Sequence, residues 1–393
     1  MKGDRKGVQL ASLAVILTLI LQINSATAVM QESYWPTNDW QVATPEQQGL
    51  NSTLLTQVDS LCNDTGDYCF LVTRNGYLVH ETYFSPYHDE TNLLSIGSTA
   101  ILVNSLLIGI AIEKGFIDNV SQKVLDFFPD RVVDNLDARK ESITIEHLLT
   151  MTSGMQWDEA NFSVWNDYYE MRETLDWIQY VLDKPMEADP GTVWNFNRGG
   201  SHLLSAIINS TTGLTPLMFA EENLFEPLGI ERYGWIADDF GINVGGSSIS
   251  LTSRGLAKLG LLCLNNGMWD DAQLVPSLWI ENMTQVHSYA NNENRYGWYW
   301  TEFGYHCWVN STAGFYGAHG REGQHVYVIP EHEIVVVFTG HVTDGYTMFY
   351  DDLVLEYVIG AILPDDVSLI LIAVGVGASI GVIAIIGVLL RKR

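Results

Sequence analysis

The pattern of apolar positions predicts strands at both ends of the chain and helices between them. Residues 52–62 repeat apolar side chains at helical spacing, whereas Tyr68 to Phe84 predicts a β-hairpin around a turn at Asn75-Gly76. We expect further helices at 172–183, 199–212, 215–225, 252–265 and 345–362, and strands at 296–300, 325–329 and 334–339. This order favours an α/β (α+β) architecture, in which helices flank an antiparallel β-sheet and a helical lobe is inserted into it.

One largely apolar stretch stands out. It runs from Ile101 to Ile112, follows a polar segment around Ser98, and ends at Glu113-Lys114-Gly115. This predicts a buried helix that begins at Ser98 and stops at Gly115, a residue that accepts left-handed backbone. Because residues three apart share a helix face, Ile101 is expected beside the Ser98 hydroxyl.

Both termini carry patterns that are typical of membrane targeting. Residues 1–28 combine basic residues, an apolar stretch and Ala26-Thr27-Ala28, which predicts a secretory signal peptide, with an uncleaved N-terminal anchor as the alternative. Val367 to Leu390 contains no charge and precedes the basic residues 391–393, which predicts one transmembrane helix and a cytoplasmic tail. The main domain is therefore expected outside the cell, held to the cell membrane by this C-terminal helix.

Composition fits that location. The formal charge is −27, which disfavours nucleic acid as a partner, and the chain has 4 cysteines. Cys62 and Cys69 flank a turn-rich loop and could form a disulfide, and Cys263 could pair with Cys307 if the fold allows it. Glycosylation sequons that support exposure begin at Asn51, Asn63, Asn119, Asn161, Asn209, Asn282 and Asn310.

Ordered sequence blocks connect residues 41–363 to a known family. The blocks are LVTRNG (71–76), GIAIEKG (109–115), HLLTMTSG (147–154), PG (190–191), LFEPLGI (224–230) and GQ (323–324). In this order they resemble the β-lactamase-related serine hydrolases, the class C β-lactamase and penicillin-binding-protein-like group that includes amidases of the 6-aminohexanoate-dimer hydrolase kind and esterases. The resemblance implies a β-lactamase/transpeptidase-like domain over 41–363 that acts on amides or esters.

The catalytic positions depart from that family. Ser98 falls on the nucleophile position, but the lysine three residues later is replaced by Ile101. The tyrosine of the second motif is replaced by Phe196, in Phe196-Asn197-Arg198. The third motif falls on Ala318-His319-Gly320. Loss of the base alone can lower turnover by about 10⁶-fold, so two losses predict impaired or lost catalysis.

Few residues could replace the missing groups. His319 is a candidate base, although it could equally be a strand histidine that points away from the site. Tyr168 and Tyr169 fall where related amidases place a helper tyrosine, or they pack in an aromatic-rich segment. Arg198 could bind a carboxylate, lie at the surface, or be neutralised by Glu322.

Two hypotheses follow. In the first, the protein has lost catalysis and retains a pocket for a small-molecule, peptide-like, ester or glycan ligand, lined by Ala318, Gly320, Arg198 and Tyr168. In the second, it is an active amidase or esterase that uses Ser98 with a non-standard base. No paired ligand spacing such as His-Glu-x-x-His occurs, so neither a metal nor a cofactor is expected. The sequence leaves the oligomeric state open.

Overall fold

The computed structural model describes residues 35–84, 88–159, 165–290, 300–320, 322–340 and 347–364. The predicted signal peptide (1–28), transmembrane helix (367–390) and tail (391–393) lie outside these residues, as do Asn161 and most of the strand predicted at 296–300.

An eight-stranded sheet forms the centre of the fold, with every neighbouring pair antiparallel and the strand order β2-β1-β13-β12-β11-β10-β9-β8. The strands are β1 (Asp67–Arg74), β2 (Tyr77–Tyr83), β8 (Ser288–Tyr289), β9 (Glu302–Phe303), β10 (Trp308–Asn310), β11 (Phe315–Gly320), β12 (Gln324–Ile329) and β13 (Ile334–Gly340). Strand β1 pairs with β13, with Phe70 opposite Phe338, so the two ends of the domain meet in one sheet. The predicted antiparallel sheet is confirmed.

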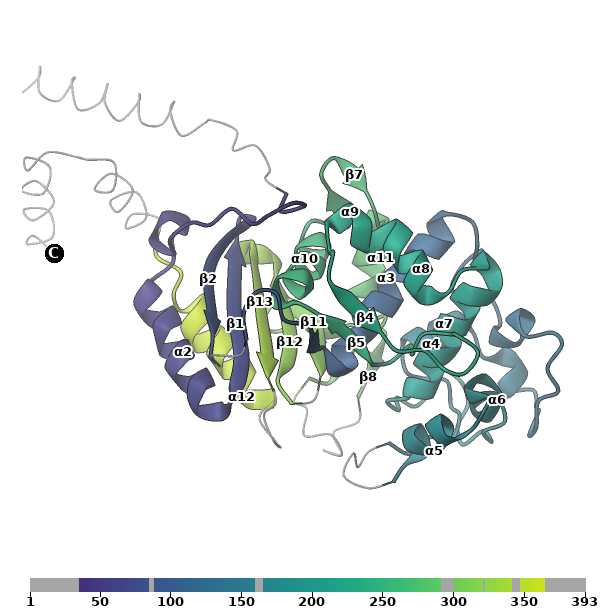
Figure 1. Ribbon diagram of the computed structural model, residues 1–393. Coiled ribbons are helices and arrows are strands. Elements are labelled where there is room, and N and C mark those ends of the chain that lie inside the picture. The colour runs from purple at the N-terminus through teal and green to yellow at the C-terminus, as the bar shows by residue number, and fades with distance from the viewer. Residues whose placement is uncertain are drawn as a thin grey trace, which may run out of the picture. The chain divides into compact units, whose positions relative to one another are not determined.

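Helices cover both faces of this sheet (Figure 1). On one face lie α2 (Ser52–Thr65), α12 (Thr347–Asp352) and the π-helical turn η7 (Leu353–Ile359), and on the other lies α10 (Ser253–Leu264). Asn51 caps α2 by accepting the Thr53 N–H, and Thr252 caps α10 by accepting the Gly255 N–H. The hairpin between β1 and β2 turns at Asn75 and Gly76, which both have positive φ as a type I′ turn requires.

The remaining helices form a lobe beside the sheet. They are α3 (Ala100–Glu113), α4 (Ile145–Leu149), α5 (Asp167–Glu173), α6 (Trp177–Leu182), α7 (Arg198–Thr212), α8 (Pro216–Ala220), α9 (Glu226–Leu228) and α11 (Ser277–Met283), with the short segments η2 (Gly97–Thr99), η3 (Val124–Phe127), η4 (Lys140–Ser142) and η5 (Glu221–Phe225). Of the other short turns, η1 (Glu46–Gln48) precedes α2, and η6 (Pro330–His332) connects β12 with β13. Strands β3 (Leu94–Ser95), β5 (Ile249–Leu251) and β4 (Tyr233–Trp235) make a small second sheet, and β6 (Met268–Trp269) pairs with β7 (Ala272–Gln273).

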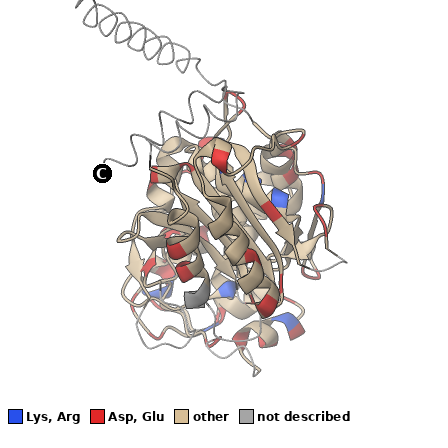
Figure 2. Ribbon diagram, turned by 90° about the vertical axis from the view of Figure 1, so that its left-hand side faces the viewer, with Lys and Arg blue, Asp and Glu red and all other residues tan. Residues whose placement is uncertain are grey.

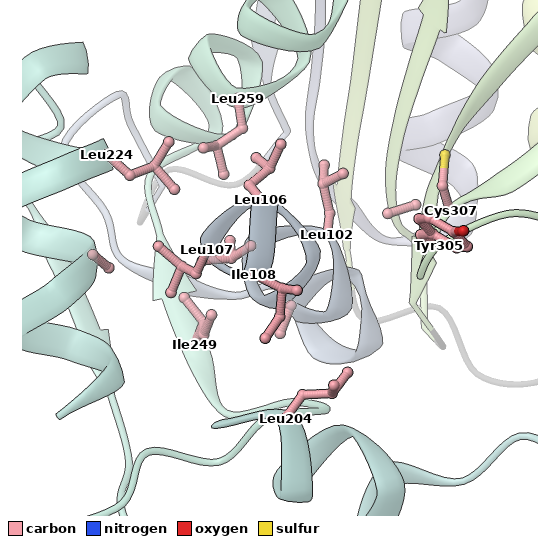
Figure 3. Close-up of a cluster of buried hydrophobic side chains, with 14 of the residues drawn as sticks. Leu102, Leu106, Leu107, Ile108, Leu204, Leu224, Ile249, Leu259, Tyr305 and Cys307 are labelled. Atoms are coloured by element: carbon pink, nitrogen blue, oxygen red, sulfur yellow. The ribbon is translucent and has the colours of Figure 1, made fainter. Parts of the chain in front are cut away.

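Helix α3 runs through the middle of the core, and nearly all of its residues are buried. Figure 3 shows its leucines pointing in several directions, with Leu106 toward Leu259 of α10 and Leu107 toward Ile249 of β5. A helix that is apolar on every side has to be surrounded by other elements. The sheet, α7 and α10 therefore assemble around it. Gly115 has φ +75° and ends the helix as predicted.

Some helix boundaries differ from the prediction. The helix expected at 172–183 is two helices, because Thr174 is extended and Asp176 starts α6 by accepting the Gln179 N–H. The helices expected at 215–225 and 345–362 each begin as α-helix and continue as π-helical turns. Capping side chains decide such breaks, and apolar spacing alone does not reveal them.

The expected Cys62–Cys69 disulfide is wrong. All four cysteines are buried free thiols. Cys62 lies on α2 in the apolar cluster of one sheet face, whereas Cys69 of β1 belongs to the cluster on the opposite face. The sheet itself separates the two sulfur atoms. Cys263 and Cys307 share one cluster and are also free thiols.

On the side that carries α2, the chain has more Asp and Glu than Lys and Arg positions (Figure 2), in keeping with the formal charge of −27. Among the described residues, no single helix is long and apolar enough to cross a membrane, although the bent pair Arg198–Thr212 and Pro216–Leu228 passes that test by length and composition.

We expect Gly109→Ala to destabilise the protein by about 1 to 3 kcal/mol, because overpacking a core forces its neighbours to move. A Cβ atom at Gly109 would lie 2.5 Å from the ring of Trp279 on α11. The measurement is chemical unfolding followed by tryptophan fluorescence. Gly234→Ala is the control, since its Cβ would have no neighbour closer than 4.0 Å. Equal stability of the two variants would contradict the tight packing of α3 against α11.

Candidate active site

Ser98 lies in the short turn η2, between strand β3 and the start of α3, and its side chain keeps little exposure. This turn is attached to the main sheet at two places. Thr99 Oγ1 donates a hydrogen bond to the Gln324 carbonyl at 3.0 Å. Gly320 of β11 packs so closely on Ile96 that an added Cβ atom at Gly320 would lie 3.1 Å from the Ile96 carbonyl oxygen. Ser98 therefore sits beside the end of β11, where it is held by packing. Among the described residues, the Ser98 hydroxyl has no hydrogen-bond partner.

Ile101 and Phe196, which are predicted to replace the lysine and the tyrosine of the family, lie in one apolar cluster. Ile101 and Phe196 are both fully buried, and the cluster also contains Met151 and Trp194. The Trp194 and Phe196 rings are 6.3 Å apart. None of these four side chains can take a proton at neutral pH. Residues 101 and 196 thus both lie in apolar surroundings.

Arg198 is the first residue of α7 and is buried against Glu159, a residue that the sequence reading did not single out. The Arg198 Nε lies 2.5 Å from Glu159 Oε1, and the Arg198 N–H donates to Glu159 Oε2 at 3.1 Å. Trp157 Nε1 donates a third hydrogen bond, at 2.6 Å. Burial raises the pKa of the Glu159 carboxyl, and the Arg198 charge counteracts that rise. Glu159 is a carboxylate that neutralises Arg198.

Tyr168 belongs to the same group of residues. Its ring lies 3.4 Å below the Arg198 guanidinium, and its hydroxyl is 2.7 Å from Ser247 Oγ. Ser247 precedes β5, which pairs with β3 through Ser250 opposite Ser95, so this loop runs toward the turn that carries Ser98. The structure thus brings Tyr168, Arg198 and Ser247 together on that side. Tyr169 faces elsewhere and stacks on the exposed Trp165 at 5.9 Å.

His319 and Ala318 occupy alternating positions on β11 and point to opposite faces of the sheet. Ala318 belongs to the cluster around α3 and α10. His319 is buried among Trp300 and Tyr327, and its Nδ1 is 2.8 Å from the Nδ1 of His325 on β12. Burial and the neighbouring His325 lower the pKa of His319 well below its ordinary value. These contacts fit a strand histidine turned into the interior, and no hydrogen bond joins it to Ser98.

His306, which the sequence did not indicate, lies beside Ile101 at the start of α3. It is fully buried, its ring Nε2 is 3.2 Å from Ser201 Oγ, and its backbone N–H donates to the Leu149 carbonyl. Burial lowers the pKa of His306 to about 3, so the ring is neutral at physiological pH. No periodicity or motif distinguishes this residue in the sequence, because a loop position in contact with several helices has no local signature.

No set of three or more His, Cys, Asp or Glu side chains is arranged to hold a metal ion within the described ranges. Two other buried or half-buried histidines have structural contacts. His147 completes the cap of α4 with Thr144, and His202 Nε2 lies 3.2 Å from Asp238 Oδ2.

The family model for the β-lactamase family matches residues 66–354, and the chain belongs to that family. It is 22% identical over 246 residues to the 6-aminohexanoate-dimer hydrolase of Paenarthrobacter ureafaciens, a match that covers 59% of this chain and 60% of that relative's length. A solved structure from Bacillus anthracis that carries the same enzyme name has a TM-score of 0.69 and 19% identity, covering 84% of this chain and 89% of that one. The octameric penicillin-binding protein homologue from Pyrococcus abyssi has a TM-score of 0.61 and 19% identity, covering 79% and 77%. The family and fold implied by the sequence blocks are confirmed.

We expect Glu159→Gln to destabilise the protein by about 3 to 5 kcal/mol, because it removes the carboxylate that pairs with the buried Arg198 charge. Glu159→Gln combined with Arg198→Gln should cost less than the sum of the two single changes, as measured in a urea-unfolding double-mutant cycle. Arg139→Gln is the control, since its pair with Asp137 is exposed at 40% and 38% and should contribute less than about 1 kcal/mol. Additive single effects would show that Glu159 and Arg198 are not coupled.

Proposed function

We propose that this protein is a β-lactamase-like family member that binds a ligand beside Ser98 and turns it over poorly or not at all. The ligand is a small molecule with the chemistry of the family's substrates, peptide-like or ester, or a glycan. Family membership fixes the fold, and fold alone does not fix the reaction. The residues at the site therefore carry the argument.

The observation that carries it is the burial of Ile101 and Phe196 in one apolar cluster with Met151. A serine hydroxyl becomes a nucleophile when a neighbouring group accepts its proton. The two residues that would do so in the family are replaced by side chains without polar atoms, in surroundings that would not stabilise a charge. Reversal of either one alone would place a polar group in that apolar cluster.

The alternative is an active amidase or esterase that uses Ser98 with a substitute base. Tyr168 is the described phenol that favours this reading, because its hydroxyl is bonded to Ser247 on the loop that runs toward the Ser98 turn. Against it, neither Tyr168 nor Ser247 forms a hydrogen bond to Ser98. The two hypotheses differ in whether Ser98 reacts with an electrophile.

We expect a fluorophosphonate probe to leave the wild-type protein unlabelled, because the Ser98 hydroxyl lacks a proton acceptor. The double variant Ile101→Lys with Phe196→Tyr should label at Ser98 once the protein carries both proton-handling groups. The measurement is gel fluorescence and peptide mass spectrometry. Adding Ser98→Ala to the double variant should abolish the label.

Each single reversion is a control and should label far less than the double variant, since an unpaired ammonium at residue 101 would shift to its neutral form or unfold the cluster. Circular dichroism establishes that every variant is folded. Strong wild-type labelling that disappears in Ser98→Ala would overturn the proposal and support the active hydrolase.

We also propose that the domain lies outside the cell and is anchored by residues 367–390. The charge pattern of both termini and the sequons support this location. In cultured cells, the full chain should remain with membranes after alkaline carbonate washing. A chain ending at Pro364 should be secreted, because the last described contact, from the Leu363 N–H to the Gly49 carbonyl, is retained.

Digestion with a glycosidase that removes N-linked sugars should lower the mass of the secreted form. Asn119 is a suitable sequon for a matched control because its side chain is exposed, and Asn119→Gln should remove one glycan without changing secretion. Retention of the shortened chain in the cytosol, without glycans, would contradict the proposed location.

A further inference from the structure

A pair of buried histidines joins the sheet to the last helix of the domain. His319 of β11 and His325 of β12 are opposite each other in the strand register, and both are only 2% exposed. Their Nδ1 atoms are 2.8 Å apart. Such a contact is a hydrogen bond in which one ring donates and the other accepts. It requires that at least one of the two Nδ1 atoms carries no proton.

Both histidine rings are buried against aromatic side chains, where a charge on either ring would be costly. His319 meets the Trp300 ring edge-on, with centroids 4.1 Å apart, and its Nε2 is buried without a hydrogen-bond partner among the described residues. His325 packs on the ring of Tyr350, 4.4 Å away, which belongs to α12. An ionised side chain in such an environment is costly unless it is paired. The contact with Tyr350 is the direct link between the histidines and the C-terminal helical segment.

Two carboxylates complete this layer from the neighbouring elements. Asp351 of α12 accepts hydrogen bonds from Tyr327 at 2.8 Å and from Trp300 at 2.5 Å. Asp67 of β1 accepts one from Tyr350 at 2.6 Å, and another from Thr65 of α2. Both carboxylates are thus held by neutral donors, and neither forms an ion pair with a histidine. Cys62 of α2 also lies near Asp67, with Asp59 close to Cys62, and Asp352 lies near Asp351.

We propose that the contact between His319 and His325 is acid-sensitive. It holds residues 347–359 on the sheet and releases them when both rings are protonated. Two protonated rings cannot keep their Nδ1 atoms 2.8 Å apart, because both would be donors with like charge. The rings must then separate, and His325 loses its packing on Tyr350. The released segment is the last described helical element before residues 365–393. This inference concerns the opposite face of the sheet from Ala318 and does not depend on the proposed function.

The sign of the pH dependence separates the histidines from the carboxylates. Burial lowers the pKa of His325 to about 3 from an ordinary 6.5, so the closed state stays neutral while an opened state takes up protons below pH 6.5. Closed-state stability from the pair is therefore full above pH 6.5 and is lost as the pH falls toward 3. Burial raises the pKa of Asp351 to about 6, so its contribution is full below pH 3.8 and is lost as the pH rises through 6. The pKa of Asp67 is also raised by burial. Among these groups, acid opening can come only from the histidines.

Hydrogen exchange of the full-length protein at pH 7.5 and pH 5.0 tests this proposal. After correction for intrinsic exchange rates, protection of residues 347–359 should fall by on the order of 10²-fold at pH 5.0, since opening takes up to about two protons on the rings and releases part of one from Asp351. Helix α10, on the other face of the sheet, should keep its protection. The double variant His319→Phe with His325→Phe should lose the pH dependence of residues 347–359.

His332→Gln is the matched control, since His332 lies on the turn between β12 and β13 and is partly exposed. This variant should behave as the wild type. The same acid-induced loss of protection in the double phenylalanine variant would overturn the proposal. If that variant does not fold, NMR of histidine-labelled wild-type protein decides. Rings of His319 and His325 that stay neutral at pH 5.0 while residues 347–359 stay protected would also overturn it.

Discussion

The burial of helix α3 on every side is the constraint on which the rest of the structure depends. A helix without a polar face cannot lie at a surface, so the sheet, α7 and α10 must enclose it. The turn that carries Ser98 directly precedes this helix. Its position is fixed by the same packing and by the hydrogen bond from Thr99 to the Gln324 carbonyl. A serine can therefore be held at the family's nucleophile position without any catalytic partner. The geometry of residue 98 is a consequence of the core, and its reactivity is a separate matter that residues 101 and 196 decide.

Replacement of a buried charge by apolar side chains has an energetic logic of its own. A lysine inside a protein needs partners that compensate its lost hydration, and well-packed apolar groups of similar volume often serve stability at least as well. Ile101 and Phe196 both satisfy that condition, because they pack in the same apolar cluster. A lysine at residue 101 beside an apolar residue 196 would lack one of its hydrogen-bond partners. Under the proposed function, the two replacements are therefore expected to occur together.

The parts of this structure that could be predicted from sequence are those with a local signature. The β1–β2 hairpin follows from alternation around Asn75-Gly76, and α3 follows from its apolar run and Gly115. The ordered blocks identified the family, and the roles that they assign to Ser98, Ile101 and Phe196 stay predictions. The Glu159 partner of Arg198 could not be predicted, because 39 residues separate them and many carboxylates were candidates. The Cys62–Cys69 error has a similar cause, since nearness along the chain does not reveal that a sheet will lie between two side chains.

Several buried polar groups of the described residues lie in layers whose members compensate one another. Arg198 and Glu159 cancel in charge, and Trp157 occupies a remaining carboxylate position. On the other sheet face, Asp351 and Asp67 accept bonds from neutral donors and lose little when they take up a proton, because a protonated carboxyl still accepts. The His319–His325 bond differs from both, since one added proton can be shared and a second removes the only acceptor. This hydrogen bond is therefore lost only when the second proton binds. Helix α12 depends on it, because the Tyr350 ring of that helix packs on His325.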